Sequence, residues 1–539
     1  MNSFIKRNLS YIIMIFILLG PIIDLLTGLC LHLFEIKLTV GIFIRLLFML
    51  FICYTSLFVY DKKKLLIPYS LFFVYMILYV LGIIVYKDGL GLMTEVQGLI
   101  KVFYFPILLV SLFSIRENVS ISPMTLFTTL FLYLIFIFVP LLLGIGYETY
   151  EITKAGTLGF YNSANEISGI ISLLTPIMFI IIVESKKIIP SMILIIMYLI
   201  VILMIGTKTP LLSLMITLGF AVLYFWIHSI KAKKYKNIAI SLGIIMIAVA
   251  GLICIIPKTT FYQNIEVHLK FLKVDEVEDI VESEKVFDHF IFSQRLTFKR
   301  HRLKDYKKAS LYQKAFGIGY LKKGKETKMI EMDYFDILYN HGLIGFIIFF
   351  GTFIYVVYKV FMQKKAFTFS RYMFDVSLVL IVLLSFFTGH ILVSPAVSLL
   401  VIIIILSLYR KNKKRILLIA NYDERPLEKD IFIKELNKVS YLDKLFVKDI
   451  NYFKQGIYKI FNYKNYDLNI NYSYHDVICN EIMNYSADTT GIYVKNGNDK
   501  LVESDYVICD KKIKNIRGKV YTNKDFLGGF RWKKKILFQ

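Results

Sequence analysis

The stretch Arg295-Leu-Thr-Phe-Lys299-Arg300-His301-Arg302 lies inside the polar segment that decides the fold, which runs from Pro257 to His341. The segment continues with Phe316-Gly-Ile-Gly319 and Glu331-Met-Asp333-Tyr-Phe-Asp336. Apolar runs of membrane length flank it on both sides, and runs of about 20 apolar residues cross a bilayer as helices. We therefore expect residues 258–340 to form a large loop at one membrane surface, and we expect this loop to carry the chemistry.

Composition indicates a membrane protein. Hydrophobic residues make up 57% of the chain and the mean hydropathy is +0.61, whereas a soluble domain is about 45–50% apolar. We expect an all-α polytopic membrane domain over residues 1–410, with about twelve transmembrane helices. The predicted helices cover residues 10–34, 38–60, 65–86, 98–115, 122–145, 165–183, 188–206, 209–229, 237–256, 342–362, 372–393 and 395–409.

Basic residues mark alternate ends of these helices. Lysine and arginine accumulate in cytoplasmic loops, so the pattern predicts cytoplasmic N- and C-termini and places the loop 258–340 outside the cell. The same rule accounts for the net charge of +24. Because no basic and aromatic recognition module accompanies that charge, we expect no nucleic-acid partner. The basic clusters lie at 62–64, 116, 186–187, 231–236, 364–371 and 410–415.

The tail, residues 411–539, differs from the rest of the chain. Short apolar runs at 415–420, 491–494 and 505–509, with a helical pattern at 427–436, predict a small cytoplasmic α/β domain. No phosphate-binding glycine loop is present, and the sequence assigns this domain no function. None of the five cysteines lies in a CxxC motif, so neither a zinc site nor a disulfide framework is expected.

Two groups of cations are candidates for binding a phosphate. In a helix, Arg295, Lys299 and Arg302 share one face at i, i+4 and i+7. Such a face is either solvated or able to bind a pyrophosphate, which arginine does with two parallel hydrogen bonds. Lys208 lies in a short turn between two predicted helices, where it either extends to the membrane surface or meets a lipid phosphate.

Acidic residues supply the candidates for proton transfer. Glu331, Asp333 and Asp336 precede a predicted membrane helix, where carboxylates are favoured by the helix dipole. The alternative is that one of them accepts a proton from a sugar hydroxyl. Asp24 and Arg45 are ionisable residues inside apolar runs, which makes them functional candidates or partners of one another.

The order of several short motifs resembles a known family. Taken together, the motifs are similar to those of the O-antigen ligase / O-antigen polymerase family of membrane glycosyltransferases, over roughly residues 1–410. They are Gly-Phe-Tyr-Asn162-Ser-Ala-Asn165-Glu166, Gly206-Thr-Lys208-Thr, Ser293-Gln-Arg295, Phe316-Gly-Ile-Gly319 and Tyr339-Asn-His341-Gly342-Leu-Ile-Gly345.

The resemblance implies glycan transfer from undecaprenyl pyrophosphate at the outer face of the bacterial cytoplasmic membrane. It implies a reaction that inverts the configuration at the anomeric carbon and needs no nucleotide sugar, metal or other cofactor. Arg295 matches the family's loop arginine and would be catalytic and bind pyrophosphate. Lys208, where the family often has Ser-Arg, would bind pyrophosphate with it, as would Lys299 and Arg302. Membrane lipid is a further partner, together with a flippase and a chain-length regulator.

One departure from the family's pattern bears on the reaction. Ligases carry a histidine about ten residues before the Gly-Leu-Ile-Gly segment, but here Glu331 stands there and His341 comes too late. This favours a polymerase of lipid-linked repeats, with Glu331 or Asp333 as the carboxylate that activates the acceptor. A ligase on the same fold and, from another class, a flippase of lipid-linked oligosaccharide remain the alternatives. The residues Asn165, Asp336 and His341 are further candidates for the site.

Overall fold

The computed structural model describes residues 2–34, 40–87, 91–149, 156–185, 187–236, 292–322, 325–363 and 368–409 of the region that matches the expected membrane domain. Beyond them it describes the strands and one helix of the tail and a few single residues, among them Asp288. The chain divides into two compact units. One comprises Met1–Leu9, Ile15–Arg116 and Thr129–Arg410, and the other Ser10–Met14, Glu117–Thr128 and Lys411–Gln539.

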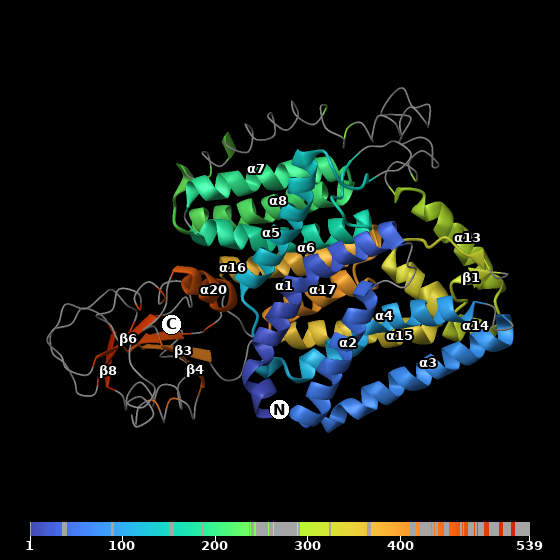
Figure 1. Ribbon diagram of the computed structural model, residues 1–539, viewed down its shortest axis with the longest axis horizontal. Coiled ribbons are helices and arrows are strands. Elements are labelled where there is room, and N and C mark those ends of the chain that lie inside the picture. The colour runs from blue at the N-terminus through green and yellow to red at the C-terminus, as the bar shows by residue number, and fades with distance from the viewer. Residues whose placement is uncertain are drawn as a thin grey trace. The chain divides into compact units, whose positions relative to one another are not determined.

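Ten of the described helices are long and apolar enough to cross a membrane, so the chain is an all-α polytopic membrane protein in this region. In Figure 1 they lie alongside one another as a bundle. The central helix is α6, of which 78% of the most apolar stretch is buried, and it packs against α8, α16 and α17. The ten are α1 (Asn2–Phe34), α2 (Val40–Tyr54) with the π-helix Thr55–Val59 that continues it, α3 (Leu66–Lys87), α4 (Leu92–Ser114), α5 (Pro123–Leu143), α6 (Ala164–Ser185), α7 (Ile188–Ile205), α8 (Lys208–Lys231), α15 (Asp333–Phe361) and α16 (Phe369–Phe387).

Four of the expected helices need correction or comment. The helix expected at 342–362 begins nine residues earlier, at Asp333, and bends at Gly342, where φ is 71° and ψ is −179°. The helix expected to reach residue 393 ends at Phe387, because Gly389 and His390 both have positive φ. The last helix, α17 (Pro395–Ser407), has 13 residues, fewer than the about 20 needed to cross a bilayer. The helix expected at 237–256 lies outside the described residues.

The described part of the polar loop covers one end of the bundle, which we call the loop end (Figure 1). It contains helix α13 (Arg295–Lys308), helix α14 (Leu311–Phe316), and the short antiparallel pair β1 (Leu321–Lys322) and β2 (Lys325–Glu326). Helix α14 packs against α3 and α15. A small apolar core of Ile318, Ile330, Met332 and Tyr339 joins this segment to the start of α15. The described residues of the loop end therefore pack against one another and against the bundle.

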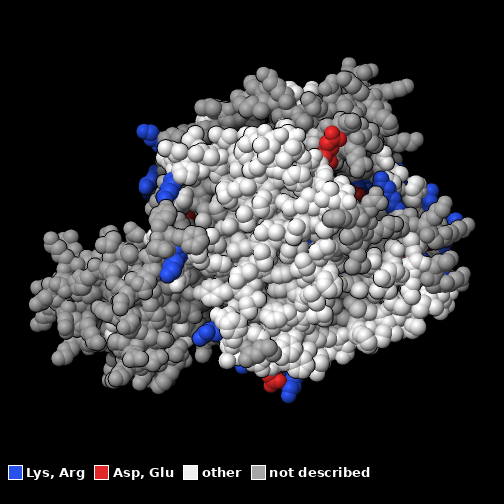
Figure 2. Space-filling model, viewed as in Figure 1, with Lys and Arg blue, Asp and Glu red and all other residues white. Residues whose placement is uncertain are grey.

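The surface of the bundle separates by charge. Figure 2 shows a broad uncharged surface across this face, with lysine and arginine gathered towards its ends. An uncharged belt between charged ends is the surface that a bilayer requires.

In the second unit, six short strands form one parallel sheet in the order β4-β3-β5-β6-β7-β8. Parallel strands need crossover connections. In this order β3, the first strand of the sheet along the chain, lies between β4 and β5, an arrangement that is typical of doubly wound α/β folds. The described helix of the tail is α20 (Tyr452–Asn462), and the strands are β3 (Arg415–Ala420), β4 (Tyr441–Phe446), β5 (Leu468–Asn471), β6 (Thr490–Val494), β7 (Tyr506–Cys509) and β8 (Lys519–Thr522).

Candidate functional site

A strained turn presents Glu331 at the loop end. Glu331 has a φ of 62°, a backbone conformation that costs a residue with a side chain of order 1–3 kcal/mol. The buried carboxylate of Asp336 accepts hydrogen bonds from the backbone N–H groups of Ile330 (2.9 Å) and Met332 (3.1 Å), on either side of Glu331. Asp336 therefore holds the turn whose middle residue is strained, and such strain is concentrated at functional sites.

A second carboxylate fixes the loop that packs on this turn. Asp333 is buried and accepts hydrogen bonds from the backbone N–H groups of His390 (2.7 Å), Ile391 (3.1 Å) and Leu392 (2.8 Å). This loop joins α16 to α17. Its Gly389 lies so close to Glu331 that an added Cβ would be 2.4 Å from the Glu331 carbonyl oxygen. Asp333 thus positions the loop against which Glu331 rests.

Arg295 begins helix α13 after an unusual turn. The two residues before it, Ser293 and Gln294, both have positive φ. Asp288, which is 3% exposed, accepts hydrogen bonds from the backbone N–H groups of Leu296 (2.9 Å) and Thr297 (2.8 Å). A carboxylate that accepts from the first N–H groups of a helix stabilises that end of it. Asp288 therefore fixes the start of α13 and with it the direction of Arg295.

Arg295 and Glu331 form an ion pair. A terminal nitrogen of Arg295 lies 3.1 Å from Oε2 of Glu331, and the two side chains are 11% and 34% exposed. Asn165, at the start of α6, donates to the same oxygen at 3.4 Å, and Arg295 also donates to the carbonyl of Phe387 at 3.4 Å. The Nε atom of Arg295 is buried without a hydrogen-bond partner among the described residues. Arg295 therefore keeps donor capacity beyond the ion pair.

Lys208 brings a second positive charge near this pair. It is the first residue of α8, and it lies close enough to Arg295 for the two charges to repel one another. The N-terminus of a helix also attracts anions through its unpaired N–H groups and its dipole. The preceding Thr207 shares a 2.6 Å hydrogen bond with Ser168 of α6, which fixes the turn. Lys208 and Arg295 together concentrate positive charge near the start of α8, which favours binding of an anion there.

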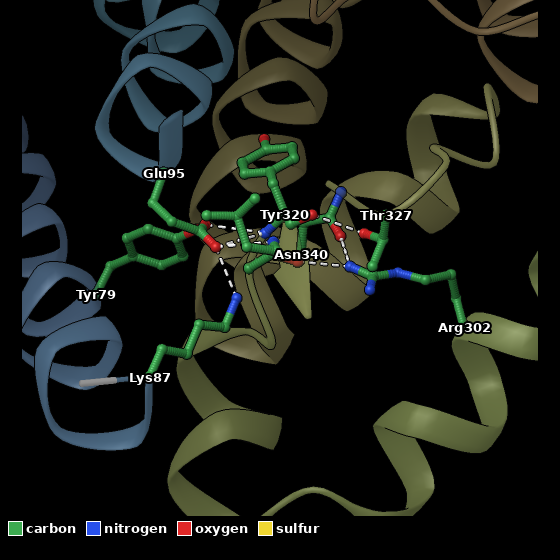
Figure 3. Close-up of polar contacts among 9 residues, drawn as sticks. Tyr79, Lys87, Glu95, Arg302, Tyr320, Thr327 and Asn340 are labelled. Atoms are coloured by element: carbon green, nitrogen blue, oxygen red, sulfur yellow. Dashed lines mark hydrogen bonds and ion pairs between the residues drawn. The ribbon is translucent and has the colours of Figure 1, made fainter. Parts of the chain in front are cut away.

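Arg302 lies elsewhere, in a buried polar network (Figure 3). Arg302 is 6% exposed, and its guanidinium donates to the carbonyl of Gly319 and to the side chain of Asn340. Burial lowers the pKa of Arg302 from its ordinary value, although arginine stays protonated in proteins. Because a terminal nitrogen of Arg302 donates to two groups inside the protein, Arg302 supports the segment between α14 and α15.

Glu95 of α4 is the other centre of that network. It is fully buried and accepts hydrogen bonds from Tyr79 (2.8 Å) and Lys87 (2.6 Å) of α3. It also accepts from the backbone N–H groups of Tyr320 and Leu321, each at 2.9 Å. Figure 3 shows the carboxylate between the α3 side chains and the 320–321 backbone. Glu95 thereby anchors the polar loop to two membrane helices.

The remaining predicted residues lie around the two centres. His341 is completely buried and shares a 2.7 Å hydrogen bond with the hydroxyl of Tyr320. Burial raises the pKa of the Tyr320 hydroxyl well above its usual range, so this group stays protonated. Lys299 places its ammonium 3.8 Å from the ring centre of Phe335. The expected partnership of Asp24 and Arg45 is confirmed by a 2.6 Å ion pair.

The structure thus brings Arg295, Glu331, Asn165 and Lys208 together, and gives Asp333, Asp336 and Arg302 internal partners. Asp288, Glu95, Tyr320 and Asn340 were missed in the sequence. The signal that identified Asp24, an ionisable residue inside an apolar run, does not find Glu95, because Glu95 precedes the run expected at 98–115 and helix α4 begins earlier, at Leu92. Among the described residues, no three His, Cys, Asp or Glu side chains lie close enough to hold a metal ion.

The family of O-antigen ligase-like membrane proteins matches residues 6–411 of the chain. No curated protein matches it. The family match covers the whole helical bundle and the described part of the polar loop, and it ends where the tail begins. The chain therefore belongs to the O-antigen ligase-like family of membrane proteins.

Proposed function

We propose that this protein polymerises oligosaccharide repeats carried on undecaprenyl pyrophosphate into a cell-surface polysaccharide. Family membership implies a role in lipid-linked polysaccharide assembly and suggests a glycan-transferring enzyme. We place the loop end at the outer face of a bacterial cytoplasmic membrane and both termini in the cytoplasm. The basic clusters support this orientation: α3 begins after Lys62–Lys64, and its other end lies at the loop end, where Tyr312 of α14 bonds to the Leu78 carbonyl.

The observation that carries the proposal is the ion pair of Arg295 and Glu331, 3.1 Å apart, with Lys208 beside it. Transfer from a lipid pyrophosphate needs stabilisation of the negative charge that develops on the leaving group, and preorganised cations supply it. It also needs a group that accepts the proton of the attacking hydroxyl. Cations and one partly exposed carboxylate meet at this point of the described structure, beside apolar helices that suit a polyprenyl chain.

The proposed step is a single displacement. The acceptor hydroxyl oxygen attacks the anomeric carbon of the donor sugar and forms the new glycosidic bond, while the bond from that carbon to the pyrophosphate oxygen breaks. The electron pair leaves with undecaprenyl pyrophosphate, whose charge Arg295 and Lys208 stabilise. The hydroxyl proton passes to Glu331. When pyrophosphate binds to Arg295, the Glu331 carboxylate loses part of its ion pair and has an oxygen available to accept the hydroxyl proton.

Glu331 is favoured over Asp333 as the base. Asp333 uses its carboxylate on three backbone N–H groups and is 1% exposed, whereas Glu331 is partly exposed and held in a strained turn. Asp333 and Asp336 are proposed as positioning residues. Because a carboxylate stands where ligases carry a histidine, the polymerase is preferred to a ligase that transfers the glycan to a different final acceptor.

The test is a product ladder. Purified protein in nanodiscs receives synthetic undecaprenyl-pyrophosphate repeats without nucleotide sugar, and the products are sized on a gel. Wild type is expected to form a ladder, Arg295→Ala to abolish it, and Arg300→Ala, on an exposed residue of the same helix, to preserve it. Transfer only to a separate acceptor would indicate the ligase. Movement of intact repeats across a vesicle bilayer without bond formation would overturn glycan transfer and indicate a flippase.

A further inference from the structure

A cavity of about 450 Å³, lined by both polar and apolar residues, lies near the Arg295–Glu331 pair. Sites for small molecules have volumes of about 300–1,000 Å³, so the cavity has room for a short saccharide. Two pairs of consecutive residues connect it to Glu331. Asn165 donates to Glu331 while Glu166 lines the cavity, and Gly389 packs against Glu331 while His390 lines the cavity. A sugar held in the cavity would therefore lie next to the proposed reaction centre.

One face of α4 gives the cavity its polarity. Thr94, Gln97, Gly98 and Lys101 line it at i, i+3, i+4 and i+7, the spacing of one helix face. Lys101 is nine residues from the start of α4 at Leu92, about 13 Å along the helix at 1.5 Å per residue. Polar and charged residues at such depth in a membrane helix are costly, and they usually face a pathway or a binding site.

Two polar groups in the cavity have no partner among the described residues. Lys101 has neither a hydrogen bond nor an ion pair there. The hydroxyl of Tyr161, on a residue that is 1% exposed, is buried without a hydrogen-bond partner. Buried polar groups are normally hydrogen-bonded, so the Tyr161 hydroxyl points to a ligand that supplies its missing partner. Lys101 is exposed, so its ammonium is accessible to an anionic group of such a ligand.

The other charges that line the cavity are already bound. Asp24 uses both carboxylate oxygens, one on Arg45 and one on Tyr133, each at 2.6 Å. Glu166 accepts a hydrogen bond from Ser394 at 2.8 Å and can still accept one from a sugar hydroxyl. Lys101 is thus the positive charge of the lining that remains to be neutralised within the described structure. The ring of Tyr320 approaches the chain at Gly98, where an added Cβ would be 2.3 Å from it, and lines the cavity as a stacking surface.

We propose that this cavity binds the glycan portion of the substrate and that Lys101 selects substrates with an anionic group, with Tyr161 bonding to a sugar hydroxyl. This inference rests on the proposed function. The anionic group is either a sugar carboxylate or a phosphate of a lipid carrier, and both offer oxygen acceptors to the ammonium. In either case, Lys101 sets a preference that the Arg295–Glu331 pair does not set.

The test measures binding, so that it stays informative if the purified protein forms no polymer. Protein in nanodiscs is titrated with hexuronic-acid disaccharides, with their carboxyl-reduced neutral counterparts, and with a short-chain prenyl pyrophosphate. Lys101→Gln is expected to lower the affinity for acidic disaccharides about 10- to 100-fold, because one charged hydrogen bond is lost. The affinity for neutral disaccharides should stay unchanged. Lys101→Arg should restore most of the preference. Tyr161→Phe should lower the affinity for acidic and neutral disaccharides alike.

Three results decide the proposal. Selective loss of the acidic disaccharides in Lys101→Gln supports the carboxylate as the anion. If Lys101→Gln instead binds the prenyl pyrophosphate more weakly and binds the disaccharides as wild type does, the anion is the lipid phosphate. Equal affinity of wild type and Lys101→Gln for all three kinds of probe would overturn the proposal. The control is Lys64→Gln, an exposed lysine outside the cavity, which should match wild type. Failure of the product ladder with selective binding intact would count against the proposed reaction and leave this site standing.

Discussion

Substitution of Glu95 by glutamine is the most informative test of how the polar loop is held on the bundle. Glu95 is 1% exposed as a side chain and forms a 2.6 Å ion pair with Lys87, which is 14% exposed. Tyr79 and two backbone N–H groups of the loop also donate to its carboxylate. A glutamine amide has one acceptor oxygen in place of two, and its NH₂ group would point at groups that are themselves hydrogen-bond donors. The Lys87 ammonium would then be buried without its counter-charge.

The expected cost follows from the nature of the bonds. Removing one partner of a buried ion pair destabilises a protein by about 3–5 kcal/mol. Lys87→Met leaves the carboxylate with its uncharged donors and should cost about 1–3 kcal/mol. The double variant should cost less than the sum of the two, with a coupling energy of about 1.5–3 kcal/mol. The exposed pair of Asp61 and Lys63, with side chains 74% and 80% exposed, is a matched control, and Asp61→Asn should cost less than about 1 kcal/mol.

The measurement is unfolding in mixed micelles, by titration with SDS and circular dichroism, for wild type, the three variants and the control. Hydrogen exchange of residues 320 and 321 in the native state should be faster in Glu95→Gln, because their N–H groups lose the carboxylate as acceptor. A stability for Glu95→Gln within 0.5 kcal/mol of wild type would refute the reasoning. A coupling energy of zero between positions 87 and 95 would refute it as well.

Three further substitutions test the contacts that position Glu331 and Arg295. Gly389→Ala places a Cβ 2.4 Å from the Glu331 carbonyl oxygen, so the turn must shift. The transfer rate should fall about 100-fold, while the circular dichroism spectrum stays unchanged. An unchanged rate would show that the turn tolerates the shift. Asp333→Asn removes one acceptor oxygen from three backbone N–H groups and should cost about 1–3 kcal/mol of unfolding free energy, whereas no loss in the same SDS titration would contradict its role. Asp288→Ala removes the cap of α13, at a cost of about 0.5–2 kcal/mol, and hydrogen exchange at residues 296–297 should rise by a matching factor.

The membrane helices were predictable because their signal is local. An apolar run of about 20 residues crosses the bilayer whatever its neighbours are, and nine expected spans correspond to long helices of the structure, with shifted ends. The tenth, α16, ended early because Gly389 and His390 take positive φ, which hydropathy does not reveal. The pairing of Asp24 with Arg45 followed from the cost of leaving either charge unpaired in a membrane.

The roles of the acidic residues were not predictable, because they depend on contacts between distant parts of the chain. Asp333 bonds to a loop 57 to 59 residues away, and Glu95 to a backbone more than 220 residues away. In the sequence, Asp333 and Glu331 differ only by their side chains and two positions. In the structure one is buried as an acceptor for backbone N–H groups, and the other projects partly exposed from a strained turn.

The central claim is that the Arg295–Glu331 pair performs glycan transfer. The most direct measurement is the single-turnover rate at which undecaprenyl pyrophosphate is released from a lipid-linked repeat when a second repeat is the acceptor, compared for wild type, Glu331→Gln and Arg300→Ala. A general base contributes about 10²- to 10⁴-fold, so Glu331→Gln should slow release by at least about 100-fold, while donor binding and the rate of Arg300→Ala stay near wild type. A rate for Glu331→Gln close to that of wild type would contradict the claim.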